Sequence, residues 1–320
     1  MALNKRSLVL PIAILIGFII NRWCAALSAI VPCLIFTILL MNFSSVKIKE
    51  LRLTHMGGLN IWLLLFQIFA SIGGYALAMA LGADKIVAEG VLVGVLCPVA
   101  AASVVIACML GAGRATITAY TIICNIMVAI VAPIYFSFIG IHQEMPFLES
   151  FALILKKIAP VIALPFFVAL FFQSCIPKAN DAIARISGAS FYIWALTLTI
   201  TLGQTINMII RNGKENMKSI VVVGIISILL CAVQFGFGKW IGKKYGDTIA
   251  GGQALGQKNS AFGIWMANVY LHPLASVFPA LYSIWQNLFN SWQLYRVAQK
   301  SKNRPHCHSH IYLRNGKEQY

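Results

Sequence analysis

The sequence predicts an all-α integral membrane protein with ten transmembrane helices, arranged as two five-helix repeats of inverted topology. The first observation is composition: hydrophobic residues make up 59% of the 320 positions and charged residues only 11%. A soluble domain of this length needs a charged surface about twice as dense. The second is a series of apolar stretches that can cross a bilayer, which takes about 20 residues each. The third is the placement of Lys and Arg in alternate loops.

The predicted spans follow the apolar stretches in chain order. Residues 7–20 are apolar after Lys5 and Arg6 and have no small-residue cleavage site behind them, so we expect this segment to be retained as the first span. The ten expected spans are 7–21, 24–42, 57–82, 87–111, 115–139, 150–174, 188–210, 217–239, 249–270 and 273–295. The fourth and ninth are unusual because both carry Gly and small polar residues at mid-membrane, and the fourth has Pro98 at its centre.

The basic residues predict the orientation of these spans. With the N-terminus inside, 17 Lys and Arg lie on the cytoplasmic side and 5 on the opposite side. Positive charge accumulates in cytoplasmic loops, so we expect both termini in the cytoplasm and residues 299–320 as a basic, disordered cytoplasmic tail. Short loops and the absence of a targeting sequence favour a bacterial inner membrane, and a eukaryotic organelle stays open.

Composition also bounds the function. The net charge of +16 comes from the same loops and tail, so it indicates topology and not a nucleic-acid partner. The eight cysteines have no metal-type spacing, and seven lie in or beside apolar runs, as small core residues do. A membrane enzyme needs an acid–base pair or a metal cluster at bilayer depth, and we find no Asp, Glu or His well inside a predicted span, except His272 at the edge of the tenth. No catalytic activity, cofactor, metal or protein partner is therefore predicted.

Five spans per repeat is an odd number, so the second repeat must run opposite to the first. We expect the first repeat over residues 1–140 and the second over residues 141–298. The interrupted spans are then each the fourth of five. A pair of interrupted spans at matching positions indicates a binding site at mid-membrane, where unwound backbone is tolerated only beside a cavity or other protein.

Several short motifs carry a resemblance to a known family. The fourth span reads Gly-Val-Leu-Cys-Pro-Val-Ala-Ala-Ala-Ser over 94–103, the ninth reads Gly-Gln-Lys-Asn-Ser over 256–260, and the tenth reads Pro-Ala-Leu-Tyr-Ser-Ile-Trp-Gln-Asn over 279–287. In this order and spacing, over nearly the whole chain, the sequence resembles the bile acid:sodium symporter family. The resemblance implies a panel part and a core part, with broken helices 4 and 9 crossing at mid-membrane. It also implies two sodium sites at that crossing, formed with helices 3 and 5, and an organic-anion substrate in the adjacent cavity.

The resemblance implies site residues position by position. For the ion site and coupling it points to Lys258, Gln67, Ser103, Thr121, Gln253, Gln257 and Asn259. For the substrate cavity it points to Pro98, Val104, Ala254 and Gly256, and polar residues within apolar spans add Gln204, Asn207 and Asn287. Three positions depart from the family pattern. The family has Ser-Asn at the first break, where this chain has Ser103 and Val104. The family has Glu-x-Gly-x-Gln-Asn at the second break, where this chain has Ala254 in place of Glu and Lys258 in place of Gln.

These departures remove sodium ligands. A sodium site needs several hard oxygen ligands, and a carboxylate usually balances the charge. Gln253 can slide into the place of the lost Glu, but it brings no negative charge. Two intact sodium sites are therefore not expected.

Lys258 supports a different hypothesis. An ammonium near mid-membrane costs several kcal/mol, about 3 on insertion scales, so it must face a cavity or a partner. We hypothesise that it occupies a sodium position, bonded to unwound carbonyls, to Gln67, or to the hydroxyl of Ser103 or Thr121. The predicted function is then sodium-independent secondary transport of organic anions, such as bile acids or other carboxylates, by alternating access.

Several alternatives stay open at this point. Lys258 could release and regain a proton, which gives a proton-coupled carrier, or stay charged, which gives a facilitator or exchanger. It could also be a structural lysine that snorkels to an interface. The protein could instead be a sodium-coupled symporter, or a non-transporting receptor with the same fold.

Overall fold

The computed structural model describes residues 9–46, 57–100 and 102–302, and the regular structure within these ranges is helical. The α-helices in chain order are α1 (Val9–Ile19), α2 (Asn21–Leu27), α3 (Val31–Ser44), α4 (Gly58–Ala80), α5 (Lys85–Leu96), α6 (Ala102–Met109), α7 (Arg114–Ile139), α8 (Phe147–Ile162), α9 (Leu164–Cys175), α10 (Pro177–Arg185), α11 (Ser190–Asn212), α12 (Met217–Lys244), α13 (Thr248–Gly256), α14 (Ser260–Tyr270) and α15 (Val277–Lys302). Short 3-10 turns, η2 (Ser28–Ile30), η5 (Ser187–Ala189) and η6 (Pro273–Ser276), join some of them.

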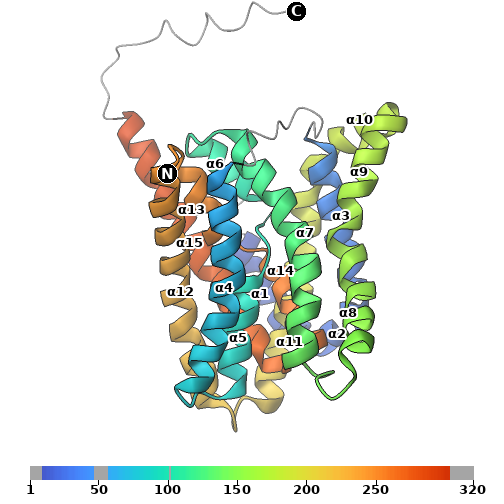
Figure 1. Ribbon diagram of the computed structural model, residues 1–320, viewed down its shortest axis with the longest axis vertical. Coiled ribbons are helices and arrows are strands. Elements are labelled where there is room, and N and C mark those ends of the chain that lie inside the picture. The colour runs from blue at the N-terminus through green and yellow to red at the C-terminus, as the bar shows by residue number, and fades with distance from the viewer. Residues whose placement is uncertain (1–8, 47–56, 101, 303–320) are drawn as a thin grey trace, which may run out of the picture.

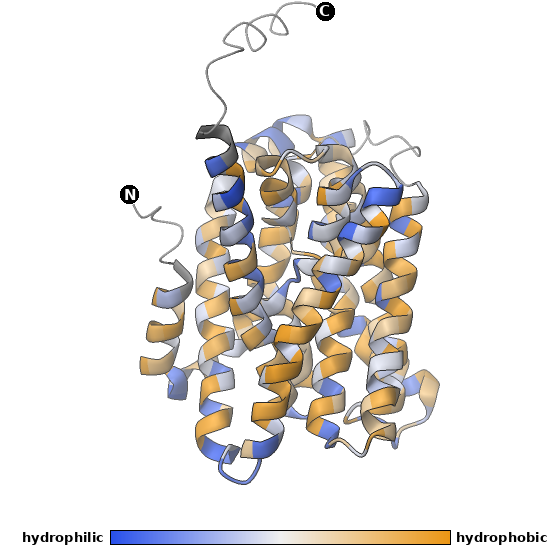
Figure 2. Cartoon of the chain, turned by 90° about the vertical axis from the view of Figure 1, so that its left-hand side faces the viewer, coloured by the Kyte–Doolittle hydropathy of each residue, from blue (hydrophilic) through white to orange (hydrophobic). Residues whose placement is uncertain are grey.

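The helices run roughly along one long axis, with most loops at the two ends (Figure 1). We call the upper end in that view, where α10 lies, the α10 end, and the opposite end the α2 end. Hydrophobic residues predominate along the middle of the helices, and hydrophilic residues gather at both ends (Figure 2). Many large hydrophobic side chains, such as Phe69, Phe138 and Leu229, are exposed. This distribution is that of a protein whose solvent is lipid along its middle and water at its ends.

Five helical segments within the described ranges are long and apolar enough to cross a membrane: Asn21–Ser44, Gly58–Ala80, Ala115–Ile139, Ser187–Asn212 and Met217–Lys244. A sixth results if α8 and α9, which meet at a bend of 43°, form one span. The chain is therefore a multi-pass helical membrane protein. These six segments match the second, third, fifth, sixth, seventh and eighth predicted spans; length and composition do not by themselves identify the other four.

The fourth and ninth predicted spans are each broken in two. Pro98 explains the first break: it has no N–H to continue a helix, and the residue before it, Cys97, is held extended with φ −46° and ψ 132°. The second break begins after Gly256, and the Asn259 side chain then caps α14 by accepting from the Phe262 N–H at 3.3 Å. Both spans are thus interrupted where the small and polar residues predicted it.

The two breaks meet inside the molecule. In Figure 1, α5 and α14 lie in the lower half, and α6 and α13 lie in the upper half. Between them the Ala100 N–H donates to the Gln257 carbonyl at 2.9 Å, and the Asn259 N–H donates to the Pro98 carbonyl at 2.8 Å. These bonds pair Val99 with Lys258 as an isolated antiparallel bridge. Each break therefore supplies hydrogen-bond partners for backbone N–H and C=O groups of the other. Unwound peptide away from water requires such partners.

The position of α13 depends on close packing against α12. The two helices approach at Gly238 and Gly251, where a Cβ on either glycine would overlap the carbonyl oxygen of the other. Only residues without a side chain allow this approach.

We expect Gly238→Ala to lower the free energy of unfolding by about 1–3 kcal/mol, because the backbone of α13 must move away. Gly236→Ala is the matched control, since a Cβ there meets nothing within 4 Å. Thermal unfolding in detergent measures both. Equal melting temperatures for the two variants would contradict this packing.

Candidate functional site

Lys258 lies at the meeting point of the two breaks and is buried, with 2% of its surface exposed. Its Nζ donates to the carbonyl oxygen of Val95 at 2.9 Å. Val95 belongs to the last turn of α5, where carbonyls lack a partner within the helix. The alternative of a lysine that snorkels to an interface is therefore wrong, because the ammonium points into the interior.

The backbone of Lys258 is held by the side chain of Gln286 on α15. The Lys258 N–H donates to Gln286 Oε1 at 2.7 Å, and Gln286 Nε2 donates to the Lys258 carbonyl at 3.1 Å. One amide thus satisfies both backbone groups of this residue and fixes the position from which the side chain extends. Gln286 also lies 3.4 Å from the Ser260 hydroxyl through its Nε2 atom.

Gln67 on α4 supports the same end of α5. Its Nε2 donates to the carbonyls of Leu96 at 2.7 Å and Cys97 at 3.0 Å, the two residues after Val95. Its Oε1 accepts from the Tyr120 hydroxyl at 2.8 Å and lies 3.3 Å from the Cys124 thiol. One version of the hypothesis expected Gln67 to bond to Lys258. Gln67 instead bonds to the carbonyls of Leu96 and Cys97 beside the lysine site.

The electrostatics of this site favour a cation. The C-terminal ends of two short helices, α5 and α13, lie here, and such ends carry partial negative charge. In the described ranges, no Asp or Glu pairs with Lys258, and the titratable groups that interact with it are the thiols of Cys97 and Cys124. The carbonyl groups thus compensate the ammonium without a carboxylate.

The other predicted ion-site residues lie near the breaks but do not bond to the Lys258 ammonium. Thr121 donates to the carbonyl of Ile117 on its own helix at 2.8 Å, and the buried Ser103 hydroxyl has no hydrogen-bond partner among the described residues. Gln253 donates to Asn290 Oδ1 at 3.0 Å. The expected bonds from Lys258 to Gln67, Ser103 and Thr121 are therefore absent from this conformation, and an unwound carbonyl takes their place.

A narrow cleft lies between α3 and the pair α6 and α7. Its lining comprises Leu39, Asn42, Phe43, Val46, Val104, Thr118 and Thr121. Val104 and Thr121 were predicted at the substrate cavity and the ion site, and the cleft brings them together with the amide of Asn42. Its cavity volume of about 20 Å³ holds about one water molecule, so it is closed to an organic anion in this conformation.

The remaining predicted cavity residues divide into two groups. Pro98, Ala254 and Gly256 lie at or beside the breaks, and the Gly256 carbonyl accepts from the Tyr282 hydroxyl at 2.9 Å. The amides of Asn207 and Asn287 are engaged elsewhere: Asn207 donates to the Asn21 carbonyl at 2.9 Å, and Asn287 donates to Ser283 on its own helix at 2.6 Å. Gln204 is half-buried on α11. The structure therefore does not gather the three polar residues of α11 and α15 around Lys258.

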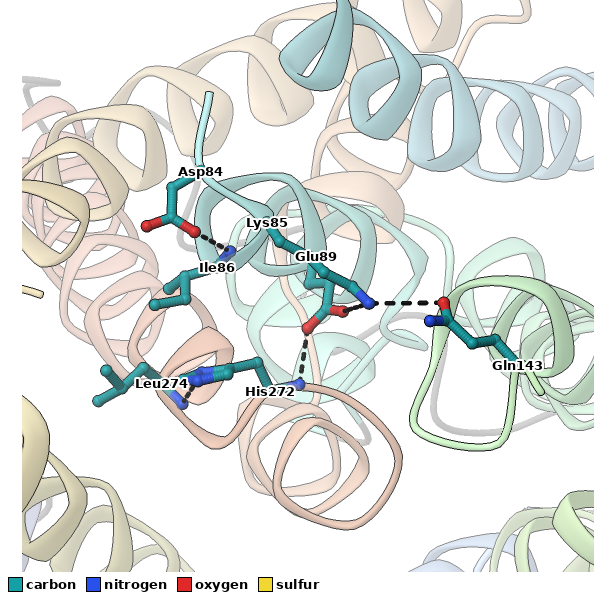
Figure 3. Close-up of polar contacts among 7 residues, drawn as sticks. All are labelled: Asp84, Lys85, Ile86, Glu89, Gln143, His272 and Leu274. Atoms are coloured by element: carbon teal, nitrogen blue, oxygen red, sulfur yellow. Dashed lines mark hydrogen bonds and ion pairs between the residues drawn. The ribbon is translucent and has the colours of Figure 1, made fainter. Parts of the chain in front are cut away.

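A buried carboxylate at the α2 end escaped the sequence reasoning. Glu89 is only 1% exposed, one turn inside α5 (Figure 3). It accepts from the His272 N–H at 2.6 Å and pairs with Lys85 Nζ at 3.7 Å, and Lys85 lies 3.5 Å from Gln143 Oε1. The fourth predicted span began only two residues earlier, so Glu89 was not counted among acidic residues well inside a span. Its contacts join the start of α5 to the turn between α14 and η6.

Asp84 caps α5 beside this cluster. The pKa of its carboxyl is held below its usual range by the Ser219 hydroxyl, at 2.7 Å, and by the Ile86 N–H, at 3.1 Å. A depressed folded-state pKa contributes stability above the unfolded pKa, and this stability is lost as pH falls through the folded value.

We expect Asp84→Ala to cost about 1 kcal/mol at neutral pH, the usual value of a helix cap. The difference in melting temperature from the parent should begin to shrink near pH 4, about the pKa of an unfolded Asp, and should be lost as pH falls through the lower folded-state pKa. Asp84→Asn, which keeps a capping oxygen, is the control with the smaller loss. A difference that does not change with pH would contradict the role of the charge.

Comparison with known proteins bears on function at a coarse level. No family model matches the sequence. The chain is 24% identical over 235 residues to a Bacillus subtilis (strain 168) protein named "Uncharacterized sodium-dependent transporter YocS". The match covers 72% of this chain and 70% of that protein. Together with the apolar helices, this relationship supports a secondary transporter and favours transport over catalysis.

Proposed function

We propose that the protein is a secondary transporter of organic anions that works by alternating access without sodium. In this proposal its ten transmembrane helices form two inverted five-helix repeats. The broken spans α5–α6 and α13–α14 cross at mid-membrane, as they do in the bile acid:sodium symporter family that the sequence resembles. Lys258 supplies the positive charge that sodium supplies in that family.

The observation that carries the proposal is the place of the Lys258 ammonium. It is buried, bonds to the freed carbonyl of Val95, and is compensated by helix ends in place of a carboxylate. A sodium ion at such a site would take the same carbonyl oxygens as ligands. Two sodium ions and the one carboxylate of the family pattern together carry a net charge of +1, which is also the charge of the Lys258 ammonium without a carboxylate.

The name of the Bacillus subtilis relative contains the words sodium-dependent. Common ancestry at 24% identity fits a shared transport mechanism with a different coupling ion. At Ala254, Lys258 and Val104 this chain lacks the carboxylate and the two carboxamides of the family pattern. We therefore place the change of coupling in these three positions.

Transport requires a conformation that the structure does not adopt. The cleft between α3 and α7 is too small for an organic anion, so α3 must separate from the pair α6 and α7 to admit one. Movement of one set of helices against another around a fixed crossing is the general plan of transporters with inverted repeats. Two coupling modes fit: Lys258 stays charged and pairs with the anion, or it exchanges a proton during the cycle.

The proposed orientation puts both termini in the cytoplasm of a bacterial cell, with the protein in the inner membrane. The α10 end, where α12 and α15 finish with Lys243, Lys244 and Arg296, then faces the cytoplasm.

Accumulation in a sealed compartment tests transport itself. Purified protein in proteoliposomes is given labelled bile acid, pyruvate and pantothenate in separate assays, with protein-free liposomes as the control. Lumenal label that detergent releases and excess unlabelled compound competes away is the expected result for at least one of them. Saturable binding to the protein without lumenal accumulation would instead identify a receptor and contradict the proposal.

A further inference from the structure

A line of buried polar side chains leads along α15 away from Lys258. It comprises Ser283, Gln286, Asn290 and Gln293, which are 1%, 6%, 3% and 9% exposed. The spacing of three or four residues places all of them on one face of the helix. Gln286 bonds to the Lys258 backbone, so the line begins at the candidate site.

The same face continues as a network with α13. Asn290 Oδ1 accepts from Gln253 Nε2 at 3.0 Å and from Gln293 Nε2 at 3.5 Å. Three other polar atoms beside the line are buried and have no partner among the described residues: Asn290 Nδ2, Gln253 Oε1 and Gln257 Oε1. A buried polar atom without a hydrogen bond costs about 1–3 kcal/mol, and a bound water removes this cost. The network therefore has more hydrogen-bonding capacity than the protein itself satisfies.

This line opens into a surface pocket at the α10 end. The pocket has a volume of about 260 Å³ and is lined by Leu110, Ile249, Trp292, Gln293, Arg296 and Val297. Gln293 belongs to both the pocket and the network. Bonds connect the pocket residue Gln293 to Asn290 and Asn290 to Gln253 on α13, and Gln286, which holds the Lys258 backbone, lies one turn before Asn290 on the same face of α15.

We propose that α13 and α15 enclose a narrow passage for water and protons, which joins the Lys258 site to this pocket. The proposal rests on the assignment of Lys258 as the built-in cation, and it gives that ammonium an aqueous route separate from the organic-anion cleft. Between Gln286 and Gln293 its lining consists of carboxamides, which bond to water as donors or as acceptors.

The charges around the passage fit protons better than metal cations. The Arg296 guanidinium stands at its mouth, 5.3 Å from the Trp292 ring centroid, and the Lys239 ammonium on α12 lies 4.9 Å from the Phe289 ring centroid. At the inner end, the titratable neighbours of Lys258 are the thiols of Cys97 and Cys124, and the Tyr282 hydroxyl bonds to Gly256 nearby. Asp247, at the start of α13, accepts from the Ala250 N–H at 2.9 Å as the helix cap, and the described residues of the polar line and the pocket lining include no Asp or Glu. The two fixed positive charges beside them disfavour a sodium route.

Hydroxyl-radical labelling with native cysteines as reporters tests the passage in the unmodified protein. Radicals are generated by a brief X-ray pulse on proteoliposomes, and oxidation of each cysteine is measured by mass spectrometry. Cys97 and Cys124 lie beside Lys258 and are fully buried, and Cys24 is equally buried on α2. We expect several-fold faster oxidation at Cys97 and Cys124 than at Cys24. Equal rates at the three thiols would overturn the proposal.

A blocking variant identifies the route. Asn290→Leu places an apolar side chain of similar size in the passage, and several-fold slower oxidation of Cys97 is expected. Asn287→Leu makes the same chemical change one turn away, at an amide bonded to its own helix, and should leave the rate unchanged. Size-exclusion chromatography checks that Asn290→Leu is folded. If the folded variant oxidises Cys97 at the parent's rate, water arrives by another route and the proposal fails. Labelling does not require transport, so this failure is separate from a failure of the proposed function.

Discussion

Lys258→Met is expected to reduce sodium-free uptake of the transported anion by about 10- to 150-fold, since a hydrogen bond to a charged group contributes about 1.5–3 kcal/mol. Methionine keeps the length and the apolar stem of the side chain and removes only the ammonium. The Val95 carbonyl then loses its partner at 2.9 Å, and the ends of α5 and α13 lose the charge that compensates them. Initial rates in proteoliposomes without sodium measure the effect.

Lys239→Met is the matched control. Lys239 on α12 is half-buried, whereas Lys258 is fully buried, and its ammonium lies over the Phe289 ring and not at the crossing. Its loss is expected to leave uptake near the parent rate. If Lys258→Met transports as fast as the parent, Lys258 has only a structural role and the tethered-cation account is wrong.

The double variant Ala254→Glu with Lys258→Gln is expected to acquire sodium-dependent uptake. It restores the carboxylate and the carboxamide of the family pattern. It also exchanges a buried positive charge for a buried negative one. An uncompensated buried charge costs about 3–5 kcal/mol, and a sodium ion bound by the new oxygen ligands would offset it.

The single variants separate charge from shape. Ala254→Glu alone leaves Lys258 as an internal counter-ion, so any remaining uptake should stay independent of sodium. The measurement is the ratio of uptake in sodium to uptake in choline, which should be near unity for the parent and rise well above it in the double variant. A double variant that is folded and transports equally in both salts would show that these positions do not select the ion.

The sequence predicted the parts of the fold that local chemistry determines. Pro98 and the run from Gly256 to Asn259 identified the two breaks, because proline and glycine act on the backbone where they stand. The 43° bend between α8 and α9 was not predicted, although Pro165 follows it directly and could have indicated it. The ten-span inverted repeat remains a prediction from loop charges and resemblance.

The candidate site was predicted less completely, because its contacts join residues far apart in the chain. Lys258 was identified from the residue type beside a break. Its partner Val95 is an ordinary aliphatic residue whose backbone oxygen, freed at a helix end, makes the bond. Gln286 and Asn287 were both polar residues of the tenth predicted span, and only Asn287 was placed at the substrate cavity. The place of Gln286 one turn after Tyr282 puts it on the face of α15 that meets the second break.

Replacement of sodium by choline in a proteoliposome uptake assay tests the central claim most directly. The parent protein and Lys258→Ala are compared with a labelled bile acid, in sodium, in choline, and in choline with an imposed proton gradient. The account predicts that the parent takes up the anion equally well in sodium and in choline, and that Lys258→Ala loses this uptake. Faster uptake with the imposed proton gradient would identify the proton as the coupling ion. Strict dependence of parental uptake on sodium would contradict the account and mean that Gln253 or backbone carbonyls rebuild a sodium site.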